Sequence, residues 1–136
     1  RFMDGMSLAV GKTTRDWATV SLVSRFGKAF GPGDSALIAA TSGGGFTGEE
    51  IVSDSWGEGF PDPVLGVRKA GRLPYLCEGV PFELTLPKRL ARACCRALDP
   101  DGMARCDVPR RINADGTVTF VFSPSLRTVW YSLVNP

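Results

Sequence analysis

Short runs of alternating apolar and polar residues, separated by turn-forming residues, recur along the whole chain. Its 16 glycines and 10 prolines punctuate the 136 residues at intervals of roughly eight to twelve. The segment Pro81–Leu86 shows the pattern clearly, because Phe82 and Leu84 alternate with Glu83 and Thr85. Side chains of a strand alternate between two faces. The pattern therefore predicts an all-β protein, a two-sheet antiparallel β-sandwich of the galectin or jelly-roll kind.

Several other segments have the composition of strands, being rich in β-branched and aromatic residues. They are Met6–Val10, Trp17–Val23, Ser35–Ala40, Glu50–Asp54, Val118–Phe122 and Val129–Val134. Two segments, Ser42–Gly48 and Phe60–Pro74, read as loops because the first is glycine-rich and the second has three prolines and little periodicity. No internal repeat or linker appears, so we expect one domain over residues 1–136.

The segment Pro87–Leu98 supports two interpretations. Its propensities, and the spacing of Leu90, Cys94 and Leu98, favour a helix. The sequence Asp-Pro-Asp-Gly that follows at Asp99–Gly102 favours instead a strand that ends in a hairpin turn. The sequence alone leaves helix and strand open for this segment.

The chain contains no histidine, which removes Ser-His-Asp and Cys-His triads and the commonest metal ligand. None of the four cysteines forms a Cys-x-x-Cys pair, so no zinc site is expected. We therefore predict that the protein is not an enzyme and that it carries no cofactor or metal. The cysteines are expected to be reduced and mostly buried thiols; the alternative is a disulfide or a redox-sensitive thiol.

The formal net charge is +2, which gives no electrostatic footprint for nucleic acid. Apolar runs are too short to span a bilayer, so membrane insertion is not expected. Seven basic residues concentrate in the second half, where they form either a solvated face or a strip for an acidic partner: Lys88, Arg89, Arg92, Arg96, Arg105, Arg110 and Arg111.

Two motifs carry a resemblance to a known family. The segment Glu49–Glu58 has a strand that runs into Trp56-Gly57-Glu58, where the family has Trp-Gly-x-Glu, so Glu58 comes one place early. The segment Glu78–Leu86 opens a strand with Gly-x-Pro-Phe-Glu. Together with Gly5–Lys12, in the same order and spacing, they resemble a galectin carbohydrate-recognition domain. The resemblance implies a sugar-binding sandwich, with cytoplasmic or non-classically secreted localisation. It also leaves a homodimer open.

The polar residues with which galectins hold a galactoside are mostly replaced. The family's His-x-Asn-Pro-Arg position holds Ile38, Ala40 and Ser42, and the next asparagine is Asp54. Losing three such partners costs roughly 4–6 kcal/mol, at about 0.5–1.5 kcal/mol or more per hydrogen bond. A micromolar site has only about −8 kcal/mol in total. Galactoside binding in the family manner is therefore expected to be lost.

The residues left as candidate ligand contacts are Trp56, Asp54, Glu58 and Ser42. A tryptophan ring can stack on a sugar face, but it can equally pack on the sandwich edge. The acidic residues between Glu49 and Asp62 read as a solvated edge, with glycosidase or calcium chemistry as the alternative. The sequence thus predicts a divergent galectin-like binding module for another glycan or a protein. The competing hypothesis is a structural or protein-interaction sandwich of a larger protein without sugar binding.

Overall fold

The computed structural model describes residues 5–27, 30–54 and 64–136. The chain divides into two compact units: a sandwich unit of Arg1–Gly43 and Glu78–Pro136, and a ribbon unit of Gly44–Cys77. Among the described residues, the only elements other than strands are two single 3-10 turns, at Lys88–Leu90 (η1) and Pro124–Leu126 (η2). The all-β class is confirmed. Two compact units can fold together or separately, so one domain over residues 1–136 remains a prediction.

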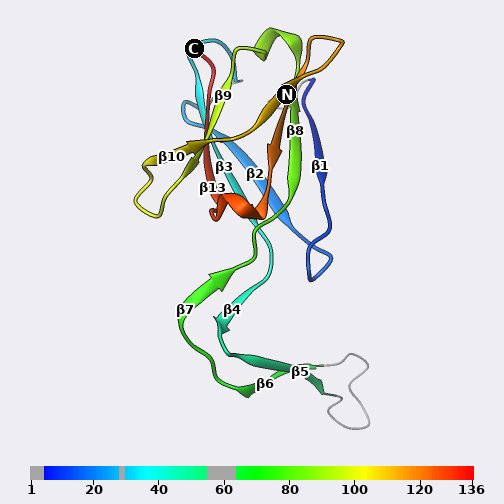
Figure 1. The fold of residues 1–136 in the computed structure, drawn as a ribbon, viewed down its shortest axis with the longest axis vertical. Helices are drawn as coiled ribbons and strands as arrows, with labels where there is room; N and C mark the ends of the chain where they lie inside the picture. The colour runs from blue at the N-terminus through cyan, green and yellow to red at the C-terminus, as the bar shows by residue number, and fades with distance from the viewer. Residues whose placement is uncertain (1–4, 28–29, 55–63) are drawn as a thin grey trace. The chain divides into compact units, whose positions relative to one another are not determined.

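The sandwich unit contains two antiparallel sheets (Figure 1). The four-stranded sheet has the order β1 (Ser7–Val10), β8 (Phe82–Leu86), β12 (Val118–Phe122) and β11 (Arg110–Ile112). The five-stranded sheet has the order β10 (Ala104–Asp107), β9 (Cys94–Leu98), β13 (Trp130–Val134), β3 (Ser35–Thr41) and β2 (Thr19–Ser24). Strands distant in sequence are therefore neighbours in both sheets.

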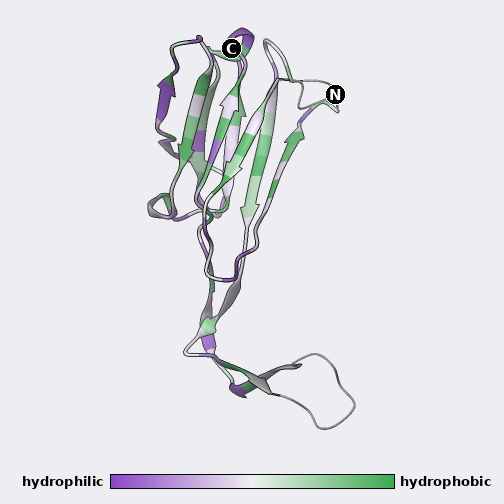
Figure 2. Ribbon diagram, turned by 90° about the vertical axis from the view of Figure 1, so that its right-hand side faces the viewer, coloured by the Kyte–Doolittle hydropathy of each residue, from purple (hydrophilic) through white to green (hydrophobic). Residues whose placement is uncertain are grey.

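One core lies between these two sheets. Aromatic rings join them: Phe82 stacks on Phe122 within one sheet at 3.9 Å, and Tyr131 of the other sheet meets Phe122 edge-on at 4.8 Å. Figure 2 shows apolar and polar residues alternating along several of these strands. Each apolar side chain fully buried here contributes about 1.5–3 kcal/mol. The two sheets supply the buried residues Phe82, Leu84, Leu86, Val118, Phe120 and Phe122 on one side and Ala36, Ile38, Ala40, Cys95, Ala97, Tyr131 and Leu133 on the other.

Most of the predicted strands of the sandwich unit are present, with ends that differ by one or two residues. Residues 17–23 alternate in the structure, because Ala18, Val20 and Leu22 pack against the core while Val23 is 61% exposed. The described strands β10 and β11 were not predicted as strands. They are short and exposed on both faces, so their sequences carry little alternation.

The structure decides the segment Pro87–Leu98 in favour of the strand. Only η1 is helical, and Cys94–Leu98 forms β9 between β10 and β13. The expected turn follows: the Asp99 carboxylate accepts the N–H groups of Asp101 and Met103, at 3.0 and 2.8 Å. Burial of alternate side chains and two flanking strands outweigh the local helix propensity.

The ribbon unit contains two two-stranded sheets, β4 (Gly44–Thr47) with β7 (Arg72–Cys77) and β5 (Glu50–Asp54) with β6 (Val64–Lys69). The prediction of loops at Ser42–Gly48 and Phe60–Pro74 was therefore wrong for residues 44–47, 64–69 and 72–74, and residues 60–63 lie outside the described residues. A Cβ atom on Gly44 would lie 2.8 Å from the Tyr75 ring, so this strand needs glycine for the close approach of the aromatic side chain. Such a strand has no apolar alternation that sequence reasoning can detect.

Candidate functional site

The four predicted site residues fall in different parts of the chain. Trp56 and Glu58 lie outside the described residues. Asp54 ends β5 in the ribbon unit, and Ser42 follows β3 in the sandwich unit. Side-chain contacts are described for Ser42 alone. A common ligand site of the four residues remains a prediction.

Ser42 belongs to a hydrogen-bonded polar cluster in the sandwich unit, which we call the clasp and which joins Thr14, Trp17, Ser42 and Glu78. Its Oγ lies 2.7 Å from the Trp17 carbonyl oxygen and 2.9 Å from Glu78 Oε2. The other carboxylate oxygen, Glu78 Oε1, accepts both the hydroxyl and the backbone N–H of Thr14, each at 2.6 Å. These hydrogen bonds, chiefly from the Thr14 hydroxyl, lower the pKa of Glu78. The clasp fixes the segment before β2 to the two points where the chain leaves and re-enters the sandwich unit.

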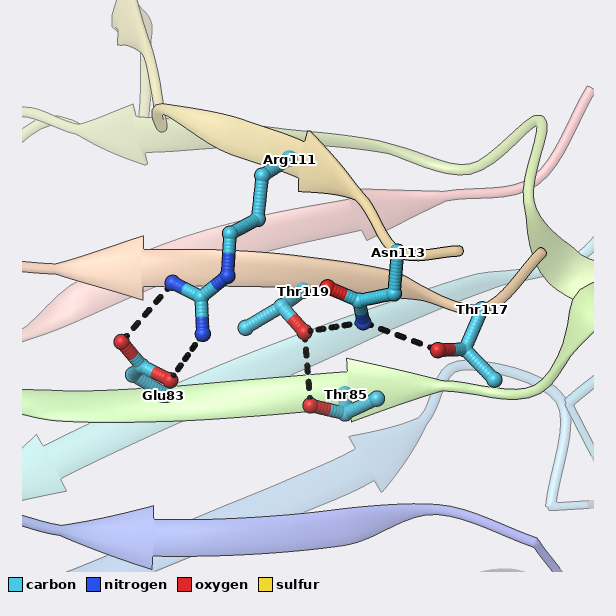
Figure 3. A network of polar contacts seen from close by, with 6 residues as sticks. All are labelled: Glu83, Thr85, Arg111, Asn113, Thr117 and Thr119. Carbon is cyan, nitrogen blue, oxygen red and sulfur yellow. Dashed lines mark hydrogen bonds and ion pairs between the residues drawn. The ribbon is translucent and has the colours of Figure 1, made fainter. Parts of the chain in front are cut away.

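A second polar cluster covers the outer face of the four-stranded sheet (Figure 3). Thr119 is 1% exposed, and its hydroxyl lies 2.8 Å from the Thr85 hydroxyl of the neighbouring strand. The Asn113 amide donates to Thr119 Oγ1 at 2.9 Å and to Thr117 Oγ1 at 2.8 Å. Both amide hydrogens of Asn113 are thereby used, and the buried Thr119 hydroxyl is satisfied.

An ion pair lies beside this cluster. Arg111 of β11 reaches over β12 and donates two hydrogen bonds to Glu83 of β8, at 2.9 and 2.7 Å (Figure 3). The bidentate contact lowers the pKa of Glu83 and raises that of Arg111, in both cases mainly through these hydrogen bonds. A carboxylate, a guanidinium and an amide on one sheet face are groups that can hydrogen-bond sugar hydroxyls.

The outer face of the five-stranded sheet is hollowed into a groove of about 870 Å³. The pairing registers place Val23, Leu37, Ser132 and Arg96 in one row across four neighbouring strands. Ser132 of the central strand β13 lies between Leu37 and Arg96 in this row. The residues lining the groove are Val23, Ser24, Arg25, Ser35, Ala36, Leu37, Cys94, Arg96, Leu98, Gly102, Ala104, Ser132, Val134 and Pro136.

The surface of the groove is mostly apolar and carries two arginine side chains. Val23, Leu37 and Val134 expose between 42% and 61% of their surface, and the charged residues among the described residues that line the groove are Arg25 and Arg96. Arg96 also contacts Asp107 at 3.2 Å, with both side chains largely exposed. An open hollow of this volume and composition suits a ligand that has apolar groups and negative charge.

Sequence reasoning missed this groove, although a signal for it exists. In a strand buried on one face, the outward positions are normally polar. Here the outward positions include Val23, Leu37, Trp130 and Val134, and Trp130 is 44% exposed one row from the groove. Apolar residues at the outward positions of three neighbouring strands indicate an interaction surface.

The basic residues of the second half do not form one free strip. Arg96 pairs with Asp107, Arg111 pairs with Glu83, and Arg110 donates to the Ala93 carbonyl oxygen at 2.6 Å. All four cysteines are free, but Cys77, Cys94 and Cys106 are exposed and only Cys95 is buried. The expectation of mostly buried thiols was therefore wrong, because three of them fall on outward positions or edge strands.

Within the residues that the structure describes, no group of three or more metal-ligating side chains gathers. No helix in the described part of the chain is long and apolar enough to cross a membrane. The chain matches no protein-family model, no curated protein and no solved structure. The galectin resemblance accordingly enters the functional argument only as a proposal.

Proposed function

We propose that this protein is a non-catalytic binding module whose principal site is the groove on the outer face of the five-stranded sheet. The observation that carries the proposal is the combination of Val23, Leu37 and Val134 with Arg25 and Arg96 in one open hollow. An exposed apolar surface of this kind on a folded sheet is typical of an interaction site. No acid–base pair or metal cluster contributes to the proposal.

The partner that fits the groove is a protein segment with apolar side chains and carboxylates. Apolar side chains of such a segment would cover Val23 and Leu37, and a carboxylate would pair with Arg25, since Arg96 already contacts Asp107. Arginine binds carboxylates with two parallel hydrogen bonds, which adds geometric specificity to the charge attraction. This is the protein-interaction form of the function that the sequence predicts.

The test is selection from a random heptapeptide display library, followed by calorimetric titration of the selected peptides. We expect enrichment of Asp or Glu together with Leu, Ile or Phe. The substitution Arg25→Glu should weaken binding at least tenfold, which is about 1.4 kcal/mol. The matched charge reversal Lys12→Glu, at an exposed residue that does not line the groove, should change affinity less than twofold. Selected peptides that lack acidic residues, or that bind Arg25→Glu normally, refute the proposal.

Glycan binding is the second candidate, and the outer face of the four-stranded sheet favours it. Glu83, Arg111 and Asn113 present a carboxylate, a guanidinium and an amide on that face. If this face binds a glycan, a glycan array should give a signal that Asn113→Ala removes and Lys12→Glu retains. We further expect no retention on a lactose column, because Ile38, Ala40 and Ser42 replace the galactoside contacts. Specific elution by lactose contradicts that expectation.

The glycan-binding candidate also includes Trp56, whose ring would stack on a sugar face. A surface platform predicts that Trp56→Ala abolishes glycan binding with little loss of stability. A core tryptophan predicts instead a loss of about 3–5 kcal/mol. Comparing the unfolding midpoint with the array signal for this single variant distinguishes the two roles. The net charge of +2 keeps nucleic acid outside the proposal.

A further inference from the structure

The row of residues that crosses the groove ends at an acidic side chain. Arg96 of β9 lies directly opposite Asp107 of β10, the strand at one edge of the five-stranded sheet. Side chains in such cross-strand pairs are close enough to interact, and Arg96 Nε donates to Asp107 Oδ1 at 3.2 Å. The row therefore begins at Val23 on the edge strand β2 and ends at Asp107 on the opposite edge strand.

The two arginines of the groove differ in their surroundings. Arg96 shares its charge with Asp107 in an ion pair whose side chains are 60% and 83% exposed. Within residues 5–27, 30–54 and 64–136, Arg25 forms no ion pair. No acidic residue is among the described residues that line the groove. The positive charge that can meet a ligand is therefore concentrated at the Arg25 end, and the Arg96 end is neutralised from outside the groove.

Asp107 competes with any carboxylate of a ligand that approaches Arg96. Such a carboxylate would have to displace Asp107 or share the guanidinium with it, and in both cases two negative charges would lie close together. Like charges juxtaposed in this way disfavour a wrong partner. Because the pair of Arg96 and Asp107 is exposed, its influence on an equilibrium constant is about two- to fivefold. That is enough to determine which of two otherwise equal ligands is preferred.

We propose that Asp107 is a specificity-determining residue of the groove, which admits a carboxylate at the Arg25 end and disfavours a second one at the Arg96 end. This inference rests on the proposed function of the groove as a site for acidic, apolar protein segments. A strand spacing of about 4.8 Å and a rise of about 3.3 Å per residue put the Cα atoms of Arg25 and Arg96 roughly 16 Å apart. An extended segment covers that distance with about five residues, so the disfavoured second carboxylate is about four to six residues from the first.

The first experiment selects the random heptapeptide library in parallel on three chains: the natural sequence, Asp107→Asn and Asp16→Asn. Asp16→Asn is the matched control, because it changes the net charge equally at an exposed residue that does not line the groove. We expect only Asp107→Asn to enrich peptides with two acidic residues four to six positions apart. Asp107→Ser, at the same exposed edge position, is a second neutral variant and should give the same result. Urea unfolding verifies that each variant is folded.

The second experiment measures the effect by calorimetric titration. Selected heptapeptides are synthesised with either Glu or Gln five residues from the acidic residue on which binding to Arg25 depends. The natural chain and Asp16→Asn should distinguish Glu from Gln by less than twofold. Asp107→Asn should bind the Glu peptide about two- to fivefold more tightly than the Gln peptide. Adding Arg96→Gln to Asp107→Asn should abolish this preference, because the released guanidinium is then absent.

The outcomes separate this inference from the proposed function. A preference for Glu that persists without Arg96 overturns the inference, because Asp107 would then act through the shape of the groove or the net charge. The same peptides from the natural chain and from Asp107→Asn also overturn it, while binding that depends on Arg25 leaves the proposed function intact. If none of the chains selects acidic peptides, the inference and the proposed function are both refuted.

Discussion

The polar cluster on the outer face of the four-stranded sheet makes a quantitative prediction about stability. Replacing Thr119 by valine keeps the shape and the β-branch but removes a hydroxyl that is 1% exposed. The change deletes the contacts to Thr85 Oγ1 at 2.8 Å and to Asn113 Nδ2 at 2.9 Å. One N–H of the partly buried Asn113 amide then loses its acceptor. Thr119→Val should therefore lower the free energy of unfolding by about 2 kcal/mol, from a lost hydrogen bond and an unsatisfied donor.

The partner substitution allows the two contributions to be separated. Thr85→Val removes the same hydroxyl pair from the other side and leaves the contact between Asn113 and Thr119 intact, so we expect a loss of about 1 kcal/mol. The double variant should lose less than the sum of the two, with a coupling of about 1 kcal/mol. Thr119→Ser keeps the hydroxyl and should recover most of the hydrogen-bond contribution.

Urea unfolding followed by circular dichroism measures these differences. With a slope of about 1–3 kcal/mol per molar urea, a 2 kcal/mol loss lowers the midpoint by roughly 1 M. Strict additivity of Thr85→Val and Thr119→Val, within about 0.3–0.5 kcal/mol, would refute the coupled network. A Thr119→Ser variant as unstable as Thr119→Val would show that the methyl group, and not the hydroxyl, carries the effect.

Three further predictions follow from the clasp, the thiols and the core. The lowered pKa of Glu78 means that its contribution to stability is present above about pH 4.5 and is lost as the pH falls through the lower folded-state pKa; Glu78→Gln should flatten the acid side of the stability profile, and an unchanged profile contradicts this. Burial raises the pKa of Cys95 to about 12, so a thiol reagent at pH 8 should titrate the other three cysteines quickly and Cys95 only on unfolding; four equally fast thiols, or two disulfides, contradict this. Leu133→Ala should cost about 2–5 kcal/mol in urea unfolding because Leu133 is fully buried, and a loss under 1 kcal/mol would show that the core collapses around the gap.

The sequence determined the strands whose two faces have different surroundings. Phe82, Leu84 and Leu86 alternate with Glu83 and Thr85 because one face meets the core and the other meets water, and the structure places them so. Residues 17–23 follow the same rule, because Ala18, Val20 and Leu22 pack against the core in the structure. The hairpin turn at Asp99–Gly102 was also readable, because its geometry depends on a few neighbouring residues.

The sequence could not determine structure that depends on distant partners. Residues 94–98 have helix propensity and become β9 only because β10 and β13 flank them. The ribbon strands β4 and β7 have no buried face, so no alternation marks them, and only the close approach of Tyr75 to Gly44 explains their pairing.

The groove shows the same division between local and tertiary information. Val23, Leu37, Ser132 and Arg96 are spread over much of the chain, and only the registers of four antiparallel strands bring them into one row. Alternation of apolar and polar residues indicates which face of a strand a side chain occupies, because successive side chains point to opposite faces. Which strands adjoin, and in which register, depends on the packing of the whole core. For that reason the sequence yielded the sandwich, and only the tertiary structure yielded its surfaces.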